Sequence, residues 1–358
     1  MKYFAGWGTL LEQCFDELCE RIGGLPDFIC DNAPEKQGRS LHGIPCISLD
    51  QTKNDPHAEF FITVRRHREL AEQIRQLGHR HIRIAHFDRG YHKFVFLGPY
   101  PAIALPAAPY PKDFFRGKHV LITGASRGLG SCLARTLAAQ GANLLLHARD
   151  TAHLADMHAR CRDLGGNVKL LAADLEQPQA IDSLIREAMG AVPAIDVLYN
   201  NAGYAPPLAD TPYRIPPQDF ERCFRINALA PILLASACIP GMLSRGFGRI
   251  VNVSTALQYE PRNSAYATSK AALDKFVADL APTLDDTGVA ISLVDPGSLQ
   301  TDMNPSGLYS AASAVNGLLI AALHAKCNGR WISAQDYARL SLDEAHAEAL
   351  HRHRFACS

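Results

Sequence analysis

The sequence predicts two α/β domains, the larger built on a doubly wound parallel sheet and preceded by the smaller. Its 358 residues exceed what one hydrophobic core usually organises. Residues 100–116 are rich in proline, which favours an extended linker over a helix. On both sides of this stretch, apolar segments of strand length alternate with segments of helical periodicity. We therefore expect a first domain at 1–99, a linker at 100–116, a second domain at 117–340 and a C-terminal tail at 341–358.

The second domain contains six short segments rich in Val, Ile and Leu, which predict buried strands. Stretches with helical periodicity separate them, for example SCLARTLAAQ at 131–140. Strands that alternate with helices imply a parallel sheet covered on both faces. The predicted strands are KHVLITG (118–124), ANLLLHA (142–148), VKLLAAD (168–174), DVLYNNAG (196–203), GRIVNVS (248–254) and VAISLVDPG (289–297).

The first domain repeats this alternation more briefly. Its helical segments are LLEQCFDELCERI at 10–22 and RRHRELAEQIRQLG at 65–78. Four strand-like segments separate them, which predicts a small Rossmann-like α/β sandwich. These segments are KYFAGWG (2–8), DFICDN (27–32), EFFITV (59–64) and HIRIAHF (81–87).

Composition argues against several classes of function. Lys plus Arg equals Asp plus Glu at 36 each, so no net charge draws the chain to nucleic acid or to an anionic membrane. The ten cysteines include no CxxC pair, which suits free thiols in a reducing compartment. No leader is recognisable at the N-terminus, and no apolar run reaches the roughly 18 residues of a membrane span. We expect a cytoplasmic protein without a membrane span or a metal site, since the histidines lack metal-binding spacing.

A glycine-rich loop, TGASRGLG at 123–130, follows the first predicted strand of the second domain and opens a helix. Gly124, Gly128 and Gly130 would let the backbone turn tightly and approach a pyrophosphate. The phosphates would then lie on the N–H groups at the helix N-terminus. The flanking strand and helix make a dinucleotide-binding Rossmann fold the expected architecture.

The segment AYATSKAAL at 265–273 carries a tyrosine and a lysine four residues apart among small residues. On a helix, Tyr266 and Lys270 project from the same face, one turn apart. A phenol with a pKa near 10 is a poor acid at neutral pH. A cation about 4 Å away would favour the phenolate by an upper limit on the order of 4 kcal/mol. We therefore expect Lys270 to lower the pKa of Tyr266.

With these motifs, residues 117–335 resemble the short-chain dehydrogenase/reductase family. Asp174 matches its adenine-contacting aspartate, NNAG at 200–203 its cofactor-flanking motif, Asn227 its helix asparagine, and PGSLQTDM at 296–303 its PGxxxTxM segment over the nicotinamide. The resemblance implies reversible hydride transfer, with Tyr266 as proton donor and Lys270 on the nicotinamide ribose. The implied cofactor residues are Gly124, Ser126, Arg127, Gly128, Leu129, Gly130, Arg149, Asp174, Leu175, Asn201, Ala202, Gly203, Tyr266, Lys270, Pro296, Gly297 and Thr301.

A third catalytic group, a hydroxyl that holds the substrate oxygen, is expected at the end of GRIVNVS. The family usually places this serine thirteen residues before its tyrosine, whereas Ser254 is twelve and Thr255 eleven residues before Tyr266. Residue type favours Ser254, while alignment of the strand could instead place Thr255 in the active position. Asn227 would hold a water that links Lys270 to solvent.

Two arginines indicate NADP as the cofactor. The additional phosphate of NADP carries about two negative charges, so its recognition requires cations near the end of the second strand. Arg127 lies inside the glycine loop, and Arg149 follows LLLHA where NAD-selective folds tend to place an acidic residue. Asp150, one residue later, is expected to turn away. Forked guanidinium groups suit phosphate geometry.

The first domain carries a weaker glycine loop, with Gly6 and Gly8 in YFAGWGTLLEQ. The stretch FICDNAPEKQGRSLHGIPCISLDQ at 28–51 resembles the small Rossmann-like modules of bacterial sugar acetyltransferases and surface-polysaccharide enzymes. Some of those modules hold a nucleotide sugar. The resemblance would place Gly6, Gly8 and Asp31 near such a ligand. The edge loop would comprise His42, Gly43, Ile44 and Pro45. A degenerate fold retained for packing or dimerisation is the alternative.

The function expected from these features is NADPH-dependent reduction of a carbonyl to a secondary alcohol. A sugar-related or surface-polysaccharide precursor is the leading substrate, and a 3-oxoacyl or polyketide carbonyl is the runner-up. The short stretch NPSGLY at 304–309 implies a small lid over an open pocket. A non-catalytic cofactor-sensing or scaffold protein is the competing class. Resemblance of the helices around 217–245 and 264–286 to those that pair in the family implies a homodimer or homotetramer.

Overall fold

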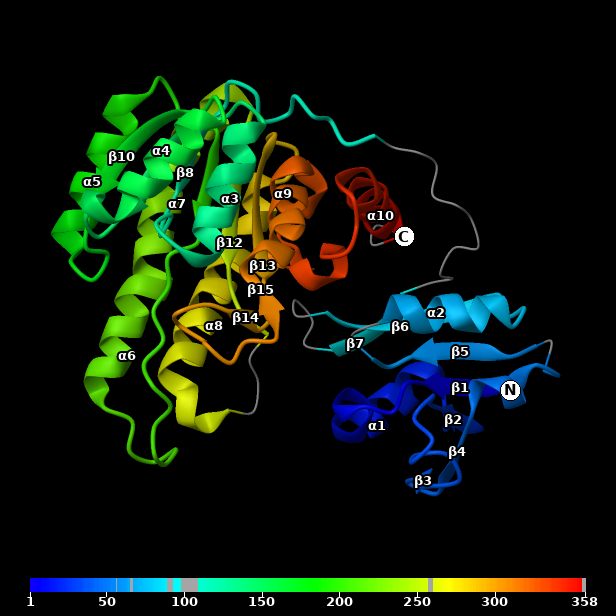
Figure 1. Cartoon of the computed structure of the whole chain (residues 1–358). Helices are drawn as coiled ribbons and strands as arrows, with labels where there is room; N and C mark the ends of the chain where they lie inside the picture. Colours follow the sequence, from blue (N-terminus) through cyan, green and yellow to red (C-terminus); the bar gives the residue numbers. More distant parts are fainter. Residues whose placement is uncertain (56, 65–66, 89–92, 98–108, 257–259, 356–358) are drawn as a thin grey trace. The chain divides into compact units, whose positions relative to one another are not determined.

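The computed structural model describes the chain except for residues 56, 65–66, 89–92, 98–108, 257–259 and 356–358. The chain divides into two compact units (Figure 1). One comprises residues 1–106 with 354–358, and the other comprises residues 107–353. The predicted linker at 100–116 falls largely outside the described residues, but its last part belongs to the second unit, where Phe115 is fully buried.

The second unit is built on a seven-stranded parallel sheet, in the order β10-β9-β8-β11-β12-β13-β16. All six predicted strands are present, and β16 is a seventh that the sequence analysis missed. The order reverses between β8 and β11, so a crevice is expected where their carboxyl ends diverge. The strands are β8 (His119–Ile122), β9 (Asn143–Ala148), β10 (Asn167–Ala172), β11 (Val197–Asn200), β12 (Gly248–Val253), β13 (Val289–Asp295) and β16 (Trp331–Ser333).

Helices cover both faces of this sheet (Figure 1). One face packs against α3 (Gly128–Ala139), α4 (Ala155–Asp163) and α9 (Val315–Leu323). The other packs against α5 (Pro178–Ala191), α7 (Ala230–Arg245) and α8 (Ser264–Leu280). The helix α6 (Pro217–Phe224) runs into α7 through a π-helical turn, Arg225–Leu229. Two short strands, β14 (Leu299–Gln300) and β15 (Tyr309–Ser310), pair beyond the sheet.

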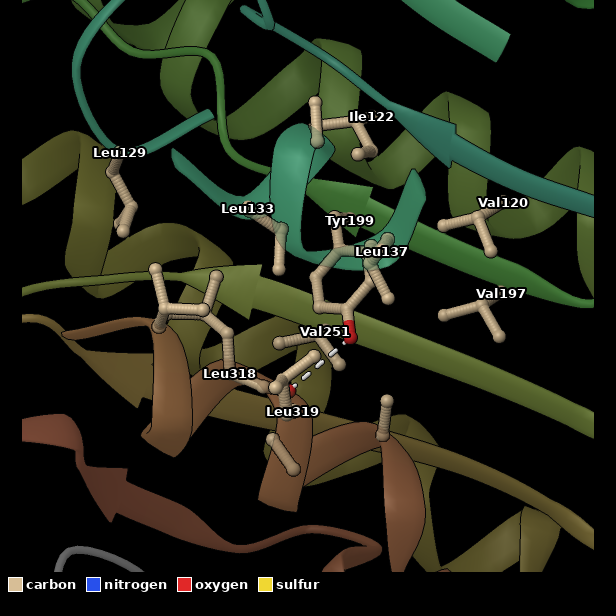
Figure 2. Close-up of a cluster of buried hydrophobic side chains, with 14 of the residues drawn as sticks. Val120, Ile122, Leu129, Leu133, Leu137, Val197, Tyr199, Val251, Leu318 and Leu319 are labelled. Atoms are coloured by element: carbon tan, nitrogen blue, oxygen red, sulfur yellow. Dashed lines mark hydrogen bonds between the residues drawn. The ribbon is translucent and has the colours of Figure 1, made fainter. Parts of the chain in front are cut away.

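Alternation along β8 divides the hydrophobic side chains between the two faces. Val120 and Ile122 belong to one core cluster and Leu121 to the other, as the period of two along a strand requires. Figure 2 shows the first cluster, in which Tyr199 of β11 lies among residues of α3, β12 and α9. The Tyr199 hydroxyl donates a hydrogen bond to the Leu318 carbonyl at 3.3 Å, which satisfies a fully buried polar group.

The first unit is also an α/β sheet with a helix on each face. Its strand order is β3-β4-β2-β1-β5-β6-β7. The helix α1 (Thr9–Ile22) packs on one face and α2 (His67–Gln76) on the other. The strands are β1 (Lys2–Ala5), β2 (Phe28–Cys30), β3 (Ser40–Leu41), β4 (Ile44–Ile47), β5 (Glu59–Ile62), β6 (His81–Asp88) and β7 (Lys93–Leu97).

Antiparallel strands at both edges of this sheet were not predicted. The β3–β4 hairpin turns through His42 and Gly43, whose φ angles are 51° and 82°. A non-glycine residue with positive φ, such as His42, is uncommon. The edge loop expected at residues 42–45 is therefore only partly correct, because Ile44 and Pro45 belong to β4. The strand β7 pairs antiparallel with β6. The central parallel order agrees with the Rossmann-like prediction, while the edges make the sheet mixed.

The predicted C-terminal tail forms a helix that packs on the second unit. This helix, α10 (Leu342–Phe355), buries Ala345 and Ala349 in the same core cluster as Leu318. The Asp343 carboxylate accepts a hydrogen bond from the Tyr110 backbone N–H at 2.7 Å. Residues 342–350, the part of this helix whose side chains are described, therefore belong to the core of the second unit.

Among the described residues, one helical run, 217–245, is long and apolar enough to cross a membrane by length and composition alone. The expectation that no apolar run reaches that length was therefore wrong. Half of its most apolar window is buried inside the unit, and Leu234 and Met242 belong to the core. Core packing of α7 accounts for this composition.

Replacing Tyr199 should test the core shown in Figure 2. Tyr199→Phe should lower the free energy of unfolding of the second unit by about 1 kcal/mol because a buried hydrogen bond is lost. Tyr199→Ala should lower it by about 3–5 kcal/mol because a cavity is added. Urea denaturation measures both. Tyr213→Phe is the matched control, since Tyr213 is 93% exposed, and an equal loss there would contradict the assignment.

Candidate active site

The glycine loop lies at the switch point of the second sheet, where it is held by residues after β11. A Cβ on Gly130 would lie 2.2 Å from the Gly124 carbonyl oxygen and 2.6 Å from the Asn201 side-chain nitrogen. A Cβ on Gly124, whose φ is +66°, would lie 2.9 Å from the Ala202 Cα. The Asn201 amide donates to the carbonyls of Thr123 and Gly124 at 2.8 and 3.1 Å. This backbone packing fits a dinucleotide phosphate cradle, as the glycine pattern predicts.

A buried histidine, His147 in β9, provides a second support for the loop. Its Nδ1 accepts the Gly124 N–H at 3.4 Å, and its Nε2 lies 3.0 Å from the Ala173 carbonyl. Burial lowers the pKa of His147 to about 4, so the imidazole is neutral near pH 7 and can accept at one nitrogen while donating at the other. His147 thereby joins the glycine loop to the strand end that carries Asp174. This role of His147 was not predicted from the sequence.

Three successive residues at the end of β12 contact three residues one turn apart on α8. The Val253 carbonyl accepts a hydrogen bond from Lys270 Nζ at 2.7 Å. The Ser254 hydroxyl donates to the Asp274 carboxylate at 2.5 Å. The side chain of Thr255 forms a hydrogen bond with Tyr266.

These contacts bear on which hydroxyl serves as the third catalytic group. Ser254, favoured by residue type, is turned to Asp274 and is only 1% exposed. Thr255, the alternative from strand alignment, meets the phenol that would donate the proton. The geometry therefore favours Thr255 over Ser254.

The expectation that Lys270 lowers the pKa of Tyr266 was wrong. Burial, followed by the nearby Asp295 carboxylate, raises the pKa of Tyr266 to about 12, and the Thr255 hydrogen bond only partly opposes this. Lys270 Nζ lies 5.9 Å from the centre of the Tyr266 ring and donates its hydrogen bond to the Val253 carbonyl. Tyr266 is a neutral phenol at pH 7, the form that can donate a proton.

Lys270 is itself perturbed by its surroundings. It is 4% exposed, and burial lowers its pKa to about 8, with Asp274 acting in the opposite direction. A buried ammonium is costly unless it is paired or hydrogen-bonded. The Val253 carbonyl and the neighbouring carboxylate provide that compensation.

Asn227 lies in the π-helical turn between α6 and α7 and is fully buried. Its amide oxygen accepts the Tyr204 N–H at 2.8 Å, and its nitrogen donates to the Tyr204 carbonyl at 2.7 Å and the Ser269 hydroxyl at 3.0 Å. It therefore joins the loop after β11 to α8. A Cβ on Gly203 would lie 3.5 Å from the Asn227 amide oxygen and 3.8 Å from Lys270 Nζ, so the NNAG motif and Lys270 are brought together.

The two arginines expected to bind the additional phosphate differ in their contacts. Arg149 is exposed at the end of β9, and no ion pair to it is found among the described residues. Asp150 turns away, as expected, and its carboxylate accepts the Ala152 N–H at 2.9 Å. Arg127 forms an ion pair of 2.9 Å with Asp302, and both side chains are exposed. Arg149 is thus the cation available for an incoming phosphate.

The 296–303 segment lies against the glycine loop. A Cβ on Gly128 would be 3.4 Å from Thr301 Cγ2, and one on Gly203 would be 3.9 Å from Met303 Cε. The segment therefore reaches from the phosphate cradle to the surroundings of Lys270. Gly297 has a φ of +76°, and its N–H donates to Asp295 at 3.0 Å.

The remaining predicted cofactor residues lie at the same edge of the sheet. Asp174 is exposed and accepts the Glu176 N–H at 3.1 Å, while Leu175 is buried in the core. Ser126 and Leu129 belong to the glycine loop and the first turn of α3, and Pro296 accepts a hydrogen bond from the Gln335 side chain at 2.7 Å. The predicted cofactor residues thus lie together at the carboxyl ends of the strands from β8 to β13.

In the first unit, side chains that follow β2 form hydrogen bonds with the backbone of the weaker glycine loop. The Asp31 carboxylate accepts the Trp7 N–H at 2.7 Å and the Ala33 N–H at 2.8 Å. Lys36 Nζ donates to the Trp7 carbonyl at 2.6 Å. The His42 ring stacks on Phe15, with 4.5 Å between ring centres. Asp31 is thus committed to the loop backbone, and a nucleotide-sugar ligand here stays a prediction.

Comparison with known proteins agrees with the geometry of the second unit. The profile of the short chain dehydrogenase family matches residues 118–308, more than half of the chain. The chain therefore belongs to the short chain dehydrogenase family, whose members are nicotinamide-dependent oxidoreductases. The match does not extend to the first unit, whose resemblance to sugar acetyltransferase modules stays a prediction.

Several relatives are similar over the second unit. A fatty acyl-CoA reductase of Acinetobacter baylyi is 35% identical over 201 residues, which cover 55% of this chain and 68% of that protein. Ketoacyl reductase HetN of a Nostoc species is 35% identical over 198 residues, 54% of this chain and 68% of that protein. A 3-oxoacyl-(acyl-carrier-protein) reductase of Agrobacterium tumefaciens, solved with NADP bound, is similar with a TM-score of 0.57 and 26% identity, covering 61% of this chain and 93% of that one.

Gly130→Ala should test whether the glycine loop is the cofactor cradle. The added methyl group would collide with the Gly124 carbonyl, so the loop would have to open and NADPH affinity should fall at least about 100-fold, roughly 3 kcal/mol. Quenching of protein fluorescence on NADPH addition measures the affinity. Gly190→Ala is the matched control, because a Cβ there meets nothing within 4 Å. Unchanged NADPH affinity in a folded Gly130→Ala protein would contradict the assignment of this loop as the cofactor-binding cradle.

Proposed function

We propose that the chain reduces a carbonyl to a secondary alcohol with NADPH. NADPH, when bound, would supply the hydride. Tyr266 would donate the proton to the carbonyl oxygen, and Thr255 would hold that oxygen by a hydrogen bond. Lys270 would bind the nicotinamide ribose. Asn227 would hold the loop after β11 against α8 through its hydrogen bonds to Tyr204 and Ser269. The contact of Thr255 with Tyr266, beside Lys270 and Gly203, carries this proposal.

NADP, rather than NAD, is supported by two observations. Arg149 is exposed at the end of the second strand of the motif, and the acidic residue beside it is used as a helix cap. Guanidinium groups suit a phosphate monoester. The similar reductase from Agrobacterium tumefaciens was solved with NADP.

An apolar carbonyl, of the 3-oxoacyl or polyketide type, is the substrate class that the surroundings of the site favour. Leu208 and Tyr213 are exposed on the loop after β11, and Met303 and Leu308 on the segment after β13. Exposed apolar side chains on two loops beside one crevice suit an apolar ligand. The relatives include reductases named for fatty acyl and ketoacyl substrates. A sugar-related substrate has no comparable support from the described residues.

Assembly and location stay predictions. The helix α6 exposes Phe220 and Phe224 one turn apart, which is consistent with the expected pairing of helices in a homodimer or homotetramer. We keep the cytoplasm as the expected compartment, in agreement with nine described cysteines that are free thiols.

Tyr266→Phe should separate binding from chemistry. The variant should bind NADPH as the wild type does, while reduction of a 3-oxoacyl thioester should fall at least about 1,000-fold because the proton donor is lost. Thr255→Val should cost about 100-fold. Loss of NADPH absorbance at 340 nm measures turnover, with Gly190→Ala as control, because a Cβ there meets nothing within 4 Å. Full activity of Tyr266→Phe would refute the mechanism.

Arg149→Glu should test the cofactor choice. The substitution replaces a cation by an anion where the additional phosphate is expected, so NADPH affinity should fall about 30-fold or more while NADH affinity changes little. Isothermal titration with both cofactors gives the ratio. Arg186→Glu, on the exposed side of α5, controls for the change of net charge. Equal weakening of both cofactors would contradict recognition of the phosphate by Arg149.

A further inference from the structure

The contact between β12 and α8 includes a side chain for which the proposed reaction has no role. Tyr266, Lys270 and Asp274 follow one another at intervals of four residues on α8, so all three lie on one face. Tyr266 and Lys270 would act on substrate and cofactor. Asp274 is held from the other side by the Ser254 hydroxyl at 2.5 Å. A short hydrogen bond to a carboxylate stabilises its charged form and fixes its orientation.

The charges around this face single out Asp274. Among the described residues, three titratable groups act electrostatically on Lys270 or Tyr266: Asp274 on α8, Cys223 on α6 and Asp295 at the end of β13. Burial raises the pKa of the Cys223 thiol to about 11, so it is uncharged near pH 7. Asp295 acts on Tyr266, whereas Asp274 acts on both Tyr266 and Lys270. Asp274 is therefore the carboxylate that opposes the effect of burial on Lys270.

We propose that Asp274, clamped by Ser254, is a positioning residue that keeps Lys270 in its ammonium form on the reactive face of α8. This role rests on the proposed function of Lys270. Without a neighbouring negative charge, a lysine this buried would lose its proton more readily. A neutral amine would no longer attract the ribose hydroxyls as a charged donor. Ser254 then supports the reaction through Asp274 without contacting the substrate.

Titration of Lys270 tests the proposal without any reaction. The intact chain is labelled with ¹³C at the lysine Cε atoms, and the Lys270 resonance is identified by its absence in Lys270→Met. In Asp274→Asn, which keeps the shape of the side chain and an acceptor for Ser254, the Lys270 midpoint should move down by about one pH unit. Ser254→Ala, which keeps the carboxylate but removes its clamp, should give a smaller shift in the same direction. Asp279→Asn is the matched control, because Asp279 pairs with the exposed Lys275 on the same helix.

The pH dependence of reduction gives the second readout. Reduction needs protonated Lys270 and protonated Tyr266, and removing Asp274 favours loss of both protons. The alkaline limb of the kcat profile should therefore move to lower pH by about one unit in Asp274→Asn. A merely structural role would lower kcat at every pH and leave the limb in place. An unchanged Lys270 midpoint in folded Asp274→Asn would overturn the proposal. A shifted midpoint in a protein that reduces no carbonyl would instead support it and refute the proposed function.

Discussion

The end of β12 holds α8 at three successive residues, and the geometry of the candidate active site depends on this contact. A strand presents alternate side chains to opposite faces, but at its carboxyl end the chain leaves the sheet and neighbouring residues can reach the same helix. Val253 uses its carbonyl, Ser254 its hydroxyl and Thr255 its hydroxyl on Lys270, Asp274 and Tyr266 respectively. Rotation of α8 by a fraction of a turn would break all three contacts together.

Burial determines the protonation state of this face more strongly than the charge of any one neighbour. It raises the pKa of Tyr266 and lowers that of Lys270, because a low-dielectric environment disfavours the charged form of each. The result is a neutral phenol beside a lysine whose protonation depends on its remaining partners. A site in this state is suited to donate a proton, which is the direction that carbonyl reduction requires. Neutral His147 shows the same effect beneath the glycine loop.

Much of the second unit could be predicted because its signals are local. Strand and helix periodicity indicated six of the seven described strands of its large sheet, and the glycine loop and the Tyr266–Lys270 spacing lie within short segments. The strand β16 has only three residues, too few for a periodic signal. In the first unit, the turn between β3 and β4 places His42, a non-glycine residue, at a positive φ beside Gly43. The C-terminal stretch, taken for a tail, packs through alanines that carry little hydrophobic signal of their own.

The sequence by itself determined the order of elements, the phosphate loop and the spacing of the tyrosine and lysine, since each depends on residues that are neighbours along the chain. Only the tertiary structure distinguished the contacts of Ser254 from those of Thr255, because their distances to α8 depend on how β12 and α8 pack and not on residue type. It also placed Asp31 on the backbone of its own loop and buried Tyr266, which raises the pKa of its phenol. Burial and long-range contacts set both of these properties, and neither is encoded in a local pattern.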